Sequence, residues 1–380
     1  MTGSTVAGVS RPDTSYSRRA LWESPARRPN SLIVSMAVLN TLPLGQSKYL
    51  ARCPRSVDHG VMSVEPVWSG LVEIACDESG FSGSNLLDPD TRVFTHASLQ
   101  LGPAEARRAV EELRERSRYV AGEYKSARLF KQRPALTWLL GPDGPLLGRA
   151  AVQLTDKYFL LAGRLTALFA GGLDYRTGTS LDADEPARRT ALALHQHDYG
   201  DSWWALLQSF IDLLRSKNRT MYDERMADFL AVASGFDPGE VDFTVRRPPL
   251  DALRDRLFDD RTLLPPLEVL IPALVETTLH WYADGNAVAM VHDEQSALTV
   301  HRIAQVNLLM DDAPLELRQT DSRTDPRVQL ADLLAGSARQ IATAELNGHG
   351  DPALTALLAP YLTPHPIWAD DASWARLTAL

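Results

Sequence analysis

The sequence predicts an α/β fold, and three features of the chain carry this prediction. Residues 71–76 and 287–291 are short apolar runs with the length and composition of buried strands. Residues 91–97 alternate enough between polar and apolar side chains to form another strand. An amphipathic helix pattern follows at 103–118, and strand, strand and helix in succession are typical of an α/β layer.

The length of 380 residues allows one large domain with an insertion, or two domains. Residues 1–65 are rich in Ser, Arg, Thr and Pro, and we expect them to be disordered or loosely attached. Translation beginning at Met62 is an alternative, and in either case residues 66–380 form the folded body. Cys53 and Cys76 lie in unlike contexts, which favours free thiols and a reducing cytoplasm.

The net charge of −9 is unevenly distributed, because residues 1–60 carry +5 and the remainder carries −14. An acidic body does not indicate nucleic-acid binding through its overall field. It is compatible with a metal site rich in carboxylates, and equally with an acidic solvated surface. No apolar run is long enough to span a membrane, so we expect a soluble protein.

The helical segments follow from periodicity and from helix start signals. In the helix at 103–118, Pro103 suits the first turn, and Ala106, Val110 and Leu113 share one face. The mostly apolar region 146–170 is also expected to be helical. Residues 182–282 look almost entirely helical, with breaks at Gly200, 235–239 and 248–249, and we interpret this block as an insertion into the α/β body. Its clearest apolar stripe is expected to be core and consists of Trp203, Leu206, Leu207, Phe210, Leu213 and Leu214.

The last long helix has a clear start signal. Asp325 is suited to the N-cap position and Pro326 to the first helical position, and the helix should run to about Glu345. The tail at 353–380 contains Trp368 and Trp374, and we expect it to pack back on the body.

Carboxylates follow the apolar strand runs. Asp77-Glu78-Ser79-Gly80 comes directly after the first run, and Asp293 comes two residues after the run at 287–291. If the two strands are neighbours, Asp77 and Asp293 face one crevice outside the sheet. Asp332 lies about two turns into the last long helix, with Gln329 on the same face, and would join them if this helix crosses the strand ends.

Such a cluster is suited to divalent cations. Glu123, or its neighbour Lys125, could complete the group. Carboxylates left alone repel each other, and all-oxygen ligation favours Mg²⁺ or Mn²⁺. A pair of ions could activate a water and stabilise the leaving oxygen of a phosphodiester, with Lys125 orienting the water or neutralising charge. Zinc is disfavoured because no Cys-x-x-Cys or His-x-x-x-His spacing occurs.

Structural interpretations of the same residues remain open. Asp77 could be an ordinary turn carboxylate and Asp293 an exposed loop carboxylate. Glu123 and Lys125 could form only an ion pair. Asp321 and Ser322 could support the site or simply cap a loop. The histidines at 96, 280, 292 and 301 are expected to be structural. A basic cluster could form the rim of a nucleic-acid groove or a solvated helix face, and it comprises Lys125, Arg128, Lys131 and Arg133.

Three motifs, in order along the chain, carry a resemblance to a known family. They are Ala75-Cys76-Asp77-Glu78-Ser79-Gly80, Glu123-x-Lys125, and Asp321-Ser322 followed by Gln-Leu-Ala-Asp-Leu-Leu-Ala-Gly at 329–336. Together they resemble the bacterial family known as domain of unknown function 3800, which is regarded as ribonuclease H-like. The resemblance spans residues 70 to about 345.

This resemblance implies a mixed sheet flanked by helices and a divalent-metal site. Asp77 would be the first metal ligand, Glu123 the second, Asp293 the third and Asp332 the last. Glu78, Ser79, Asp321 and Gln329 would support them. The helical block departs from a minimal ribonuclease H-like domain, which bears on the substrate that can reach the site.

The sequence therefore favours a metal-dependent nuclease that hydrolyses DNA or RNA, using Asp77, Glu123, Lys125, Asp293 and Asp332. Two other functions remain open. A non-catalytic binding or regulatory module on the same fold would leave the acids apart. A nucleotide phosphohydrolase would have a closed pocket of nucleotide size.

Overall fold

The computed structural model describes residues 71–118, 124–170, 185–215, 220–259, 266–282, 287–310 and 315–379. The chain divides into two units, Met1–Ser63 and Val64–Leu380, and every described residue belongs to the second. The expectations about residues 1–65, Met62 and Cys53 therefore fall outside the described residues. Cys76 is a buried free thiol.

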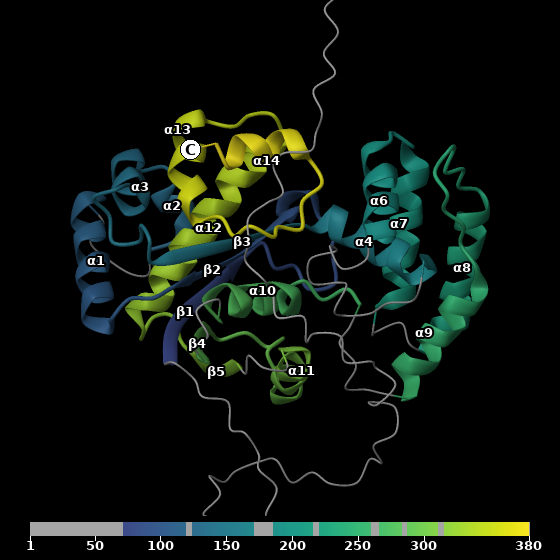
Figure 1. Ribbon diagram of the computed structural model, residues 1–380, viewed down its shortest axis with the longest axis horizontal. Coiled ribbons are helices and arrows are strands. Elements are labelled where there is room, and N and C mark those ends of the chain that lie inside the picture. Colours follow the sequence, from purple (N-terminus) through teal and green to yellow (C-terminus); the bar gives the residue numbers. More distant parts are fainter. Residues whose placement is uncertain are drawn as a thin grey trace, which may run out of the picture. The chain divides into compact units, whose positions relative to one another are not determined.

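A mixed sheet forms the centre of the second unit (Figure 1). Within the described residues it has five strands, in the order β3-β2-β1-β4-β5. β1 pairs antiparallel with β2 and β2 with β3, whereas β1 with β4 and β4 with β5 are parallel. The strands are β1 (Leu71–Ser79), β2 (Val93–Leu99), β3 (Ala150–Asp156), β4 (Ala287–Asp293) and β5 (Leu315–Thr320). The expected α/β fold with a mixed sheet is confirmed.

Helices flank this sheet and fill the connections between its strands. Between β2 and β3 lie α1 (Pro103–Arg116), α2 (Ser126–Leu129) and α3 (Arg133–Leu140). Between β3 and β4 lie α4 (Lys157–Ala170), α6 (Glu185–Gln196), α7 (Asp201–Leu214), α8 (Tyr222–Ser234), α9 (Arg247–Asp259) and α10 (Leu270–Tyr282). The others are α11 (Val300–Met310), α12 (Pro326–Leu346), α13 (Pro352–Leu358) and α14 (Asp371–Leu377), with short 3₁₀ turns η1 (Pro89–Thr91) and η3 (Ala359–Tyr361).

Both faces of β1 are covered by apolar side chains. Ile74 and Cys76 belong to one hydrophobic cluster, whereas Ala75 belongs to another. Successive side chains of a strand point to opposite faces, so the two clusters lie on opposite sides of the sheet. A strand buried on both faces needs apolar residues at successive positions, which explains the consecutive apolar residues Ile74, Ala75 and Cys76.

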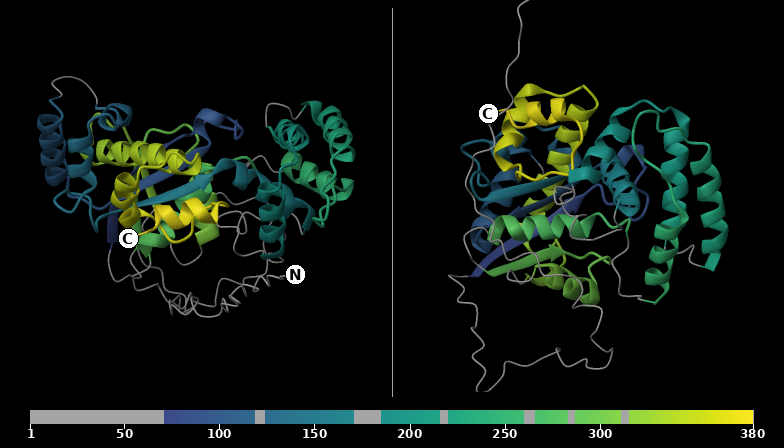
Figure 2. Two further views of the ribbon diagram at one scale, coloured as in Figure 1. Left: turned by 90° about the horizontal axis from the view of Figure 1, so that it is seen from above. Right: turned by 45° about the vertical axis from the view of Figure 1, so that its right-hand side comes forward.

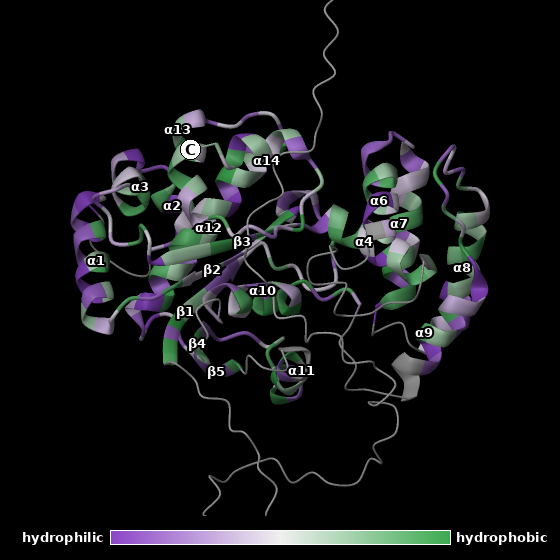
Figure 3. Cartoon of the chain, in the orientation of Figure 1, coloured by the Kyte–Doolittle hydropathy of each residue, from purple (hydrophilic) through white to green (hydrophobic). Residues whose placement is uncertain are grey.

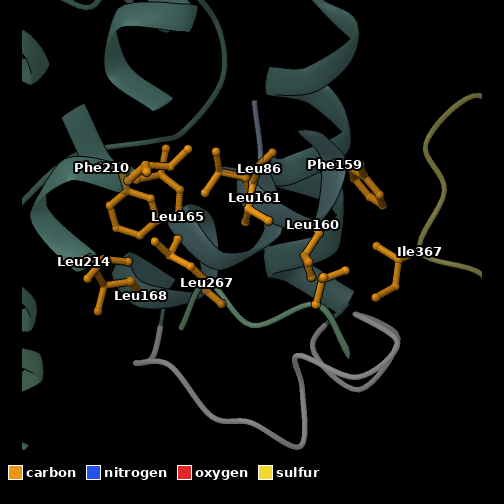
Figure 4. Close-up of a cluster of buried hydrophobic side chains, with 14 of the residues drawn as sticks. Leu86, Phe159, Leu160, Leu161, Leu165, Leu168, Phe210, Leu214, Leu267 and Ile367 are labelled. Carbon is orange, nitrogen blue, oxygen red and sulfur yellow. The ribbon is translucent and has the colours of Figure 1, made fainter. Parts of the chain in front are cut away.

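The first cluster extends from the sheet into the helices that follow β3 (Figure 4). It joins Phe159 and Leu165 of α4 to Phe210 and Leu214 of α7. The stripe predicted on α7 is buried throughout, so its assignment to the core is confirmed. The regular elements described in the region 182–282 are all helices. Four of them, α6 to α9, form a group together with α4 (Figures 1 and 2).

The second cluster lies beneath α1 and α12. α1 buries Ala106, Val110 and Leu113, as its periodicity predicts, and turns hydrophilic residues outward (purple in Figure 3). α12 begins as expected, since Asp325 accepts a hydrogen bond from the backbone N–H of Arg327 and Pro326 occupies the first turn. α12 packs on β1 and β2.

The expectation of a helix over 146–170 is wrong for its first part. Residues Ala150–Asp156 form β3, and only Lys157–Ala170 are helical. β3 is buried from Ala151 to Asp156, so it lacks the alternation that identifies a half-exposed strand. A short apolar run of this kind cannot be distinguished from a buried helix by periodicity. β5 has no counterpart among the strands expected from the sequence.

The C-terminal segment covers the outer edge of β3. The backbone N–H of Ile367 donates to the carbonyl oxygen of Leu154 (3.1 Å), and that of Asp156 donates to the carbonyl oxygen of Ile367 (2.7 Å). Trp368 is buried, and its Nε1 donates to Oγ of Ser373 (2.9 Å). The tail therefore packs on the body as expected and closes an edge that would otherwise be open to another strand. Among the described helices, none is long and apolar enough to cross a membrane.

Gly336 allows α2 to approach α12 closely. A Cβ atom built at Gly336 would overlap Cβ and Oγ of Ser126. We predict that Gly336→Ala lowers the free energy of unfolding by about 1–3 kcal/mol, the usual effect of overpacking. Urea denaturation would measure this loss. In the Ser126→Gly background, Gly336→Ala should lower the free energy of unfolding by less than it does in the parent. An equal loss in the two backgrounds would contradict the proposed contact.

Candidate active site at the carboxyl ends of two strands

Asp77 and Asp293 lie side by side at the ends of neighbouring parallel strands. The register of β1 and β4 pairs Cys76 with His292, so the next residue on each strand is an aspartate. Asp77 projects to the same face as Ala75, and Asp293 to the same face as Val291, because side chains two apart share a face. Ala75 and Val291 both belong to the cluster beneath α12. Both aspartates therefore face α12.

Asp332 reaches this group from α12. It is half-buried, and its neighbours Ala331 and Leu333 are buried. Burial, followed by the negative charges of Glu78, Asp332 and Asp293, raises the pKa of Asp77 from 3.8 to about 9. The acids predicted at Asp77, Asp293 and Asp332 are thus brought close enough to repel one another. Asp77 holds a proton at neutral pH unless a cation compensates the surrounding charge.

Backbone N–H groups fix two of these carboxylates. Asp77 Oδ1 accepts a hydrogen bond from the N–H of Glu78 (2.7 Å), and Asp293 Oδ1 accepts one from the N–H of Ser322 (2.9 Å). The Asp321-Ser322 motif therefore contacts the site through the backbone of Ser322. The carboxylate of Asp321 instead accepts hydrogen bonds from Arg323, which lower the pKa of Asp321 to about 2.

Glu78 points to the opposite face of the sheet from Asp77. Its Oε1 accepts a hydrogen bond from Nε2 of Gln295 (2.6 Å), and its Oε2 lies 3.5 Å from Nε2 of His292. Glu78 thus influences Asp77 through charge and not through contact on the same face. Ser79 shares the face of Asp77 and accepts a hydrogen bond from Nε of Arg339 (2.9 Å). Gln329 is half-buried, one turn before Asp332.

Of the predicted Glu123-x-Lys125 pair, Glu123 lies outside the described residues. Lys125 is exposed and occupies the N-cap position of α2, immediately before Ser126, which meets Gly336 of α12. Gly336 is one helical turn after Asp332, so Lys125 lies beside the part of α12 that carries the acid. In the basic cluster, Arg128 and Lys131 are exposed, and Arg133 pairs with Asp351 (3.1 Å).

Two cations near the site are missing from the expectations based on sequence. Arg339 lies seven residues after Asp332, a spacing that places both on one side of the helix. Lys157 is fully buried and donates to the carbonyl oxygen of Gly80 (3.1 Å), Oγ of Ser82 (2.7 Å) and Oγ1 of Thr91 (2.8 Å). The sequence signal that could have identified it is a lysine directly before the apolar run that begins at Tyr158.

Lys157 and Gly80 shape the turn after β1. Gly80 has φ = +87°, which disfavours any other residue there. The three acceptors of Lys157 match the three N–H donors of an ammonium group. Burial lowers the pKa of Lys157 from 10.5 to about 8, so the group is charged at neutral pH. The segment that carries Asp77-Glu78-Ser79 is therefore fixed from its far end.

His96 and His292 form a buried pair on the face opposite to Asp77. Their Nε2 atoms are 3.3 Å apart, and Nδ1 of His96 lies 2.8 Å from Oγ1 of Thr277. Nδ1 of His292 donates to the carbonyl oxygen of Asp293 (2.9 Å), since that oxygen can only accept. Burial holds the pKa of His96 well below its usual value. Both histidines are hydrogen-bonded, as expected of structural residues, and His292 also fixes the backbone at Asp293.

The described residues do not contain a group of three or more His, Cys, Asp or Glu side chains arranged to hold a metal ion. Asp77, Asp293 and Asp332 are nevertheless close enough for their charges to interact.

Comparison of the chain with protein-family models, with curated proteins and with solved structures found no match. The resemblance to the domain of unknown function 3800 family therefore stays a prediction.

Replacing Asp77 tests the raised pKa of its buried carboxyl group. The raised pKa means that folded Asp77 keeps a proton that the unfolded chain releases between about pH 4 and 9. The stability linked to this proton is present below pH 4 and is lost as the pH rises toward 9. We therefore predict that Asp77→Asn, in EDTA, is more stable than the parent at pH 8 by at least about 1.4 kcal/mol, the value of one pKa unit.

Urea unfolding at pH 5 and pH 8 would measure this difference, which should shrink at the lower pH. Asp143→Asn is the control, since Asp143 is exposed. A difference that does not depend on pH would contradict the raised pKa of Asp77.

Replacing Lys157 tests its buried charge. Between about pH 8 and 10.5 the unfolded chain holds a proton that folded Lys157 has lost, so the stability linked to this group rises over that range. We predict that the parent gains stability relative to Lys157→Met between pH 7.5 and 9.5 in urea unfolding. The exposed Lys131→Met should show no such change, and a constant difference for Lys157→Met would count against the lowered pKa.

Proposed function

We propose that this protein is a divalent-metal-dependent nuclease that hydrolyses phosphodiester bonds. The observation that carries the proposal is the placement of Asp77 and Asp293 at adjacent positions of neighbouring parallel strands, on the face covered by the helix of Asp332. Ligands commonly bind outside the carboxyl ends of strands in open α/β sheets.

The donor set fits a hard cation. Asp77, Asp293 and Asp332 offer only carboxylate oxygens, which Mg²⁺ and Mn²⁺ prefer, and Glu123 would be the fourth ligand. Burial and the neighbouring negative charges raise the pKa of Asp77, and a bound cation would compensate both effects. A bound ion would supply the positive charge that activates water and stabilises the leaving oxygen. Lys125, beside the same part of α12, would orient the water or neutralise charge.

The fold supports a ribonuclease H-like assignment. The sheet is mixed, with the acids at the ends of β1 and β4 and the last acid on a helix packed along β1. In this interpretation α6 to α10 belong to a helical insertion. The motif resemblance supports the same assignment.

The two alternatives are less well supported. A non-catalytic module on this fold requires the acids to lie apart, whereas the charges of Asp293 and Asp332 raise the pKa of Asp77. A nucleotide phosphohydrolase requires a nucleotide-sized pocket at the acids. A cavity of about 510 Å³ lies at the other end of β1, near Glu73 and Arg327, and its lining includes none of the three acids.

Cleavage of labelled DNA and RNA, single- and double-stranded, with Mg²⁺ or Mn²⁺ tests the proposal. We predict that Asp77→Asn and Asp332→Asn each lower kcat at least about 100-fold, because each removes a carboxylate ligand of the cation that would activate the water and stabilise the leaving oxygen. EDTA should abolish cleavage, and the exposed Asp143→Asn should cleave like the parent. Full activity of Asp77→Asn, or activity in EDTA, would refute the proposed site.

A further inference from the structure

Arg339 lies next to the acids on the face of the sheet that carries Asp77. Its Nε donates to Oγ of Ser79 (2.9 Å), and its Nη1 donates to the carbonyl oxygen of Asp90 (3.2 Å). Ser79 follows Asp77 by two residues on the same face of β1, a distance of about 7 Å along the strand. The guanidinium is therefore fixed two residues beyond Asp77 along the strand.

The charge of Arg339 is not compensated by a carboxylate in the described part of the chain. Arg327, on the same helix, pairs with Glu73 and Asp325. Arg339 has hydrogen bonds only to the uncharged acceptors at Ser79 and Asp90, and its Nη2 has none among the described residues. Because a guanidinium presents five N–H donors in a planar fork, several remain directed away from these two contacts.

The position of Arg339 is fixed by packing. A Cβ atom at Gly80 would lie 2.9 Å from Cδ of Arg339, so the arginine stem passes directly over the turn after β1. Lys157 holds the other side of this turn through Gly80, Ser82 and Thr91. The charge of Arg339 also helps to lower the pKa of Lys157, which shows that the two cations are close. Asp88 and Asp156 act on Lys157 in the opposite sense. The charge available to an anion is therefore that of Arg339, which has no carboxylate partner among the described residues.

We infer that Arg339 binds a phosphate group of the nucleic-acid substrate beside the cluster of Asp77, Asp293 and Asp332. This inference rests on the proposed function and names a residue that neither the sequence motifs nor the acids indicate. Guanidinium groups bind phosphate through two parallel hydrogen bonds, which a lysine ammonium cannot reproduce. Lys157 acts as a positioning residue, since its three donors are already occupied by the turn.

The test compares Arg339→Gln and Arg339→Lys with the charge-matched control Arg116→Gln. Arg116 is exposed on α1 and pairs with Glu112. Binding of fluorescein-labelled single-stranded DNA and RNA oligonucleotides is measured by fluorescence anisotropy in Ca²⁺ over a range of salt concentrations, and kcat and KM are measured in Mg²⁺. Circular dichroism establishes that each variant is folded.

We expect Arg339→Gln to weaken binding about 10-fold or more and to reduce the slope of log affinity against log salt by about 0.7, the value of one phosphate contact on a single strand. Arg339→Lys should restore the slope but only part of the affinity, because it keeps the charge and loses the planar fork. If Arg339→Gln does not fold, the partial loss in Arg339→Lys carries the test.

The two proposals fail separately. Equal affinity and salt slope for Arg339→Gln and Arg116→Gln would overturn the role of Arg339, whatever the outcome of the cleavage assay. A parent protein that binds oligonucleotide through Arg339 but cleaves nothing with Mg²⁺ or Mn²⁺ would refute the nuclease and support the phosphate site.

Discussion

The packing of α12 along β1 is the constraint on which the rest of the structure depends. Arg327 at the start of the helix pairs with Glu73 near the start of the strand, and Arg339 donates to Ser79 at the strand end. Helix and strand therefore run in the same direction, with the acid of the helix between these two contacts. Two further contacts hold α12 in place. α2 approaches it closely at Gly336, and Oγ1 of Thr95 donates a hydrogen bond to the carbonyl oxygen of Ala335 (2.8 Å).

The candidate site places charge where the fold would otherwise be apolar. Asp77 is 7% exposed, and its position beside Asp293 follows from the same register that pairs the apolar residues of β1 and β4. Burial of repelling acids lowers stability in the absence of a counter-ion. Proteins retain such arrangements at functional sites, where perturbed pKa values are concentrated. Binding of a cation by the acids would explain why the protein retains an arrangement that lowers its stability.

The sequence predicted the parts of this site that depend on local patterns. Strand ends located Asp77 and Asp293, and a capped helix located Asp332, because each pattern needs only neighbouring residues. β3 was missed because a strand buried on both faces has no period of two. Arg339 and Lys157 were missed because their importance comes from contacts with Ser79 and Gly80, far away in sequence.

The pairing of β1 with β4 also bears on how the chain folds. It joins Cys76 to His292, with the entire helical block between the two strands. Such a pairing has a high contact order, so the entropy of closing the loop opposes it until the intervening helices have formed. We therefore expect the two aspartates to meet late in folding. Substitutions that destabilise α6–α9 would then slow folding and lower the fraction of molecules in which the two aspartates come together, although these helices are remote from the acids.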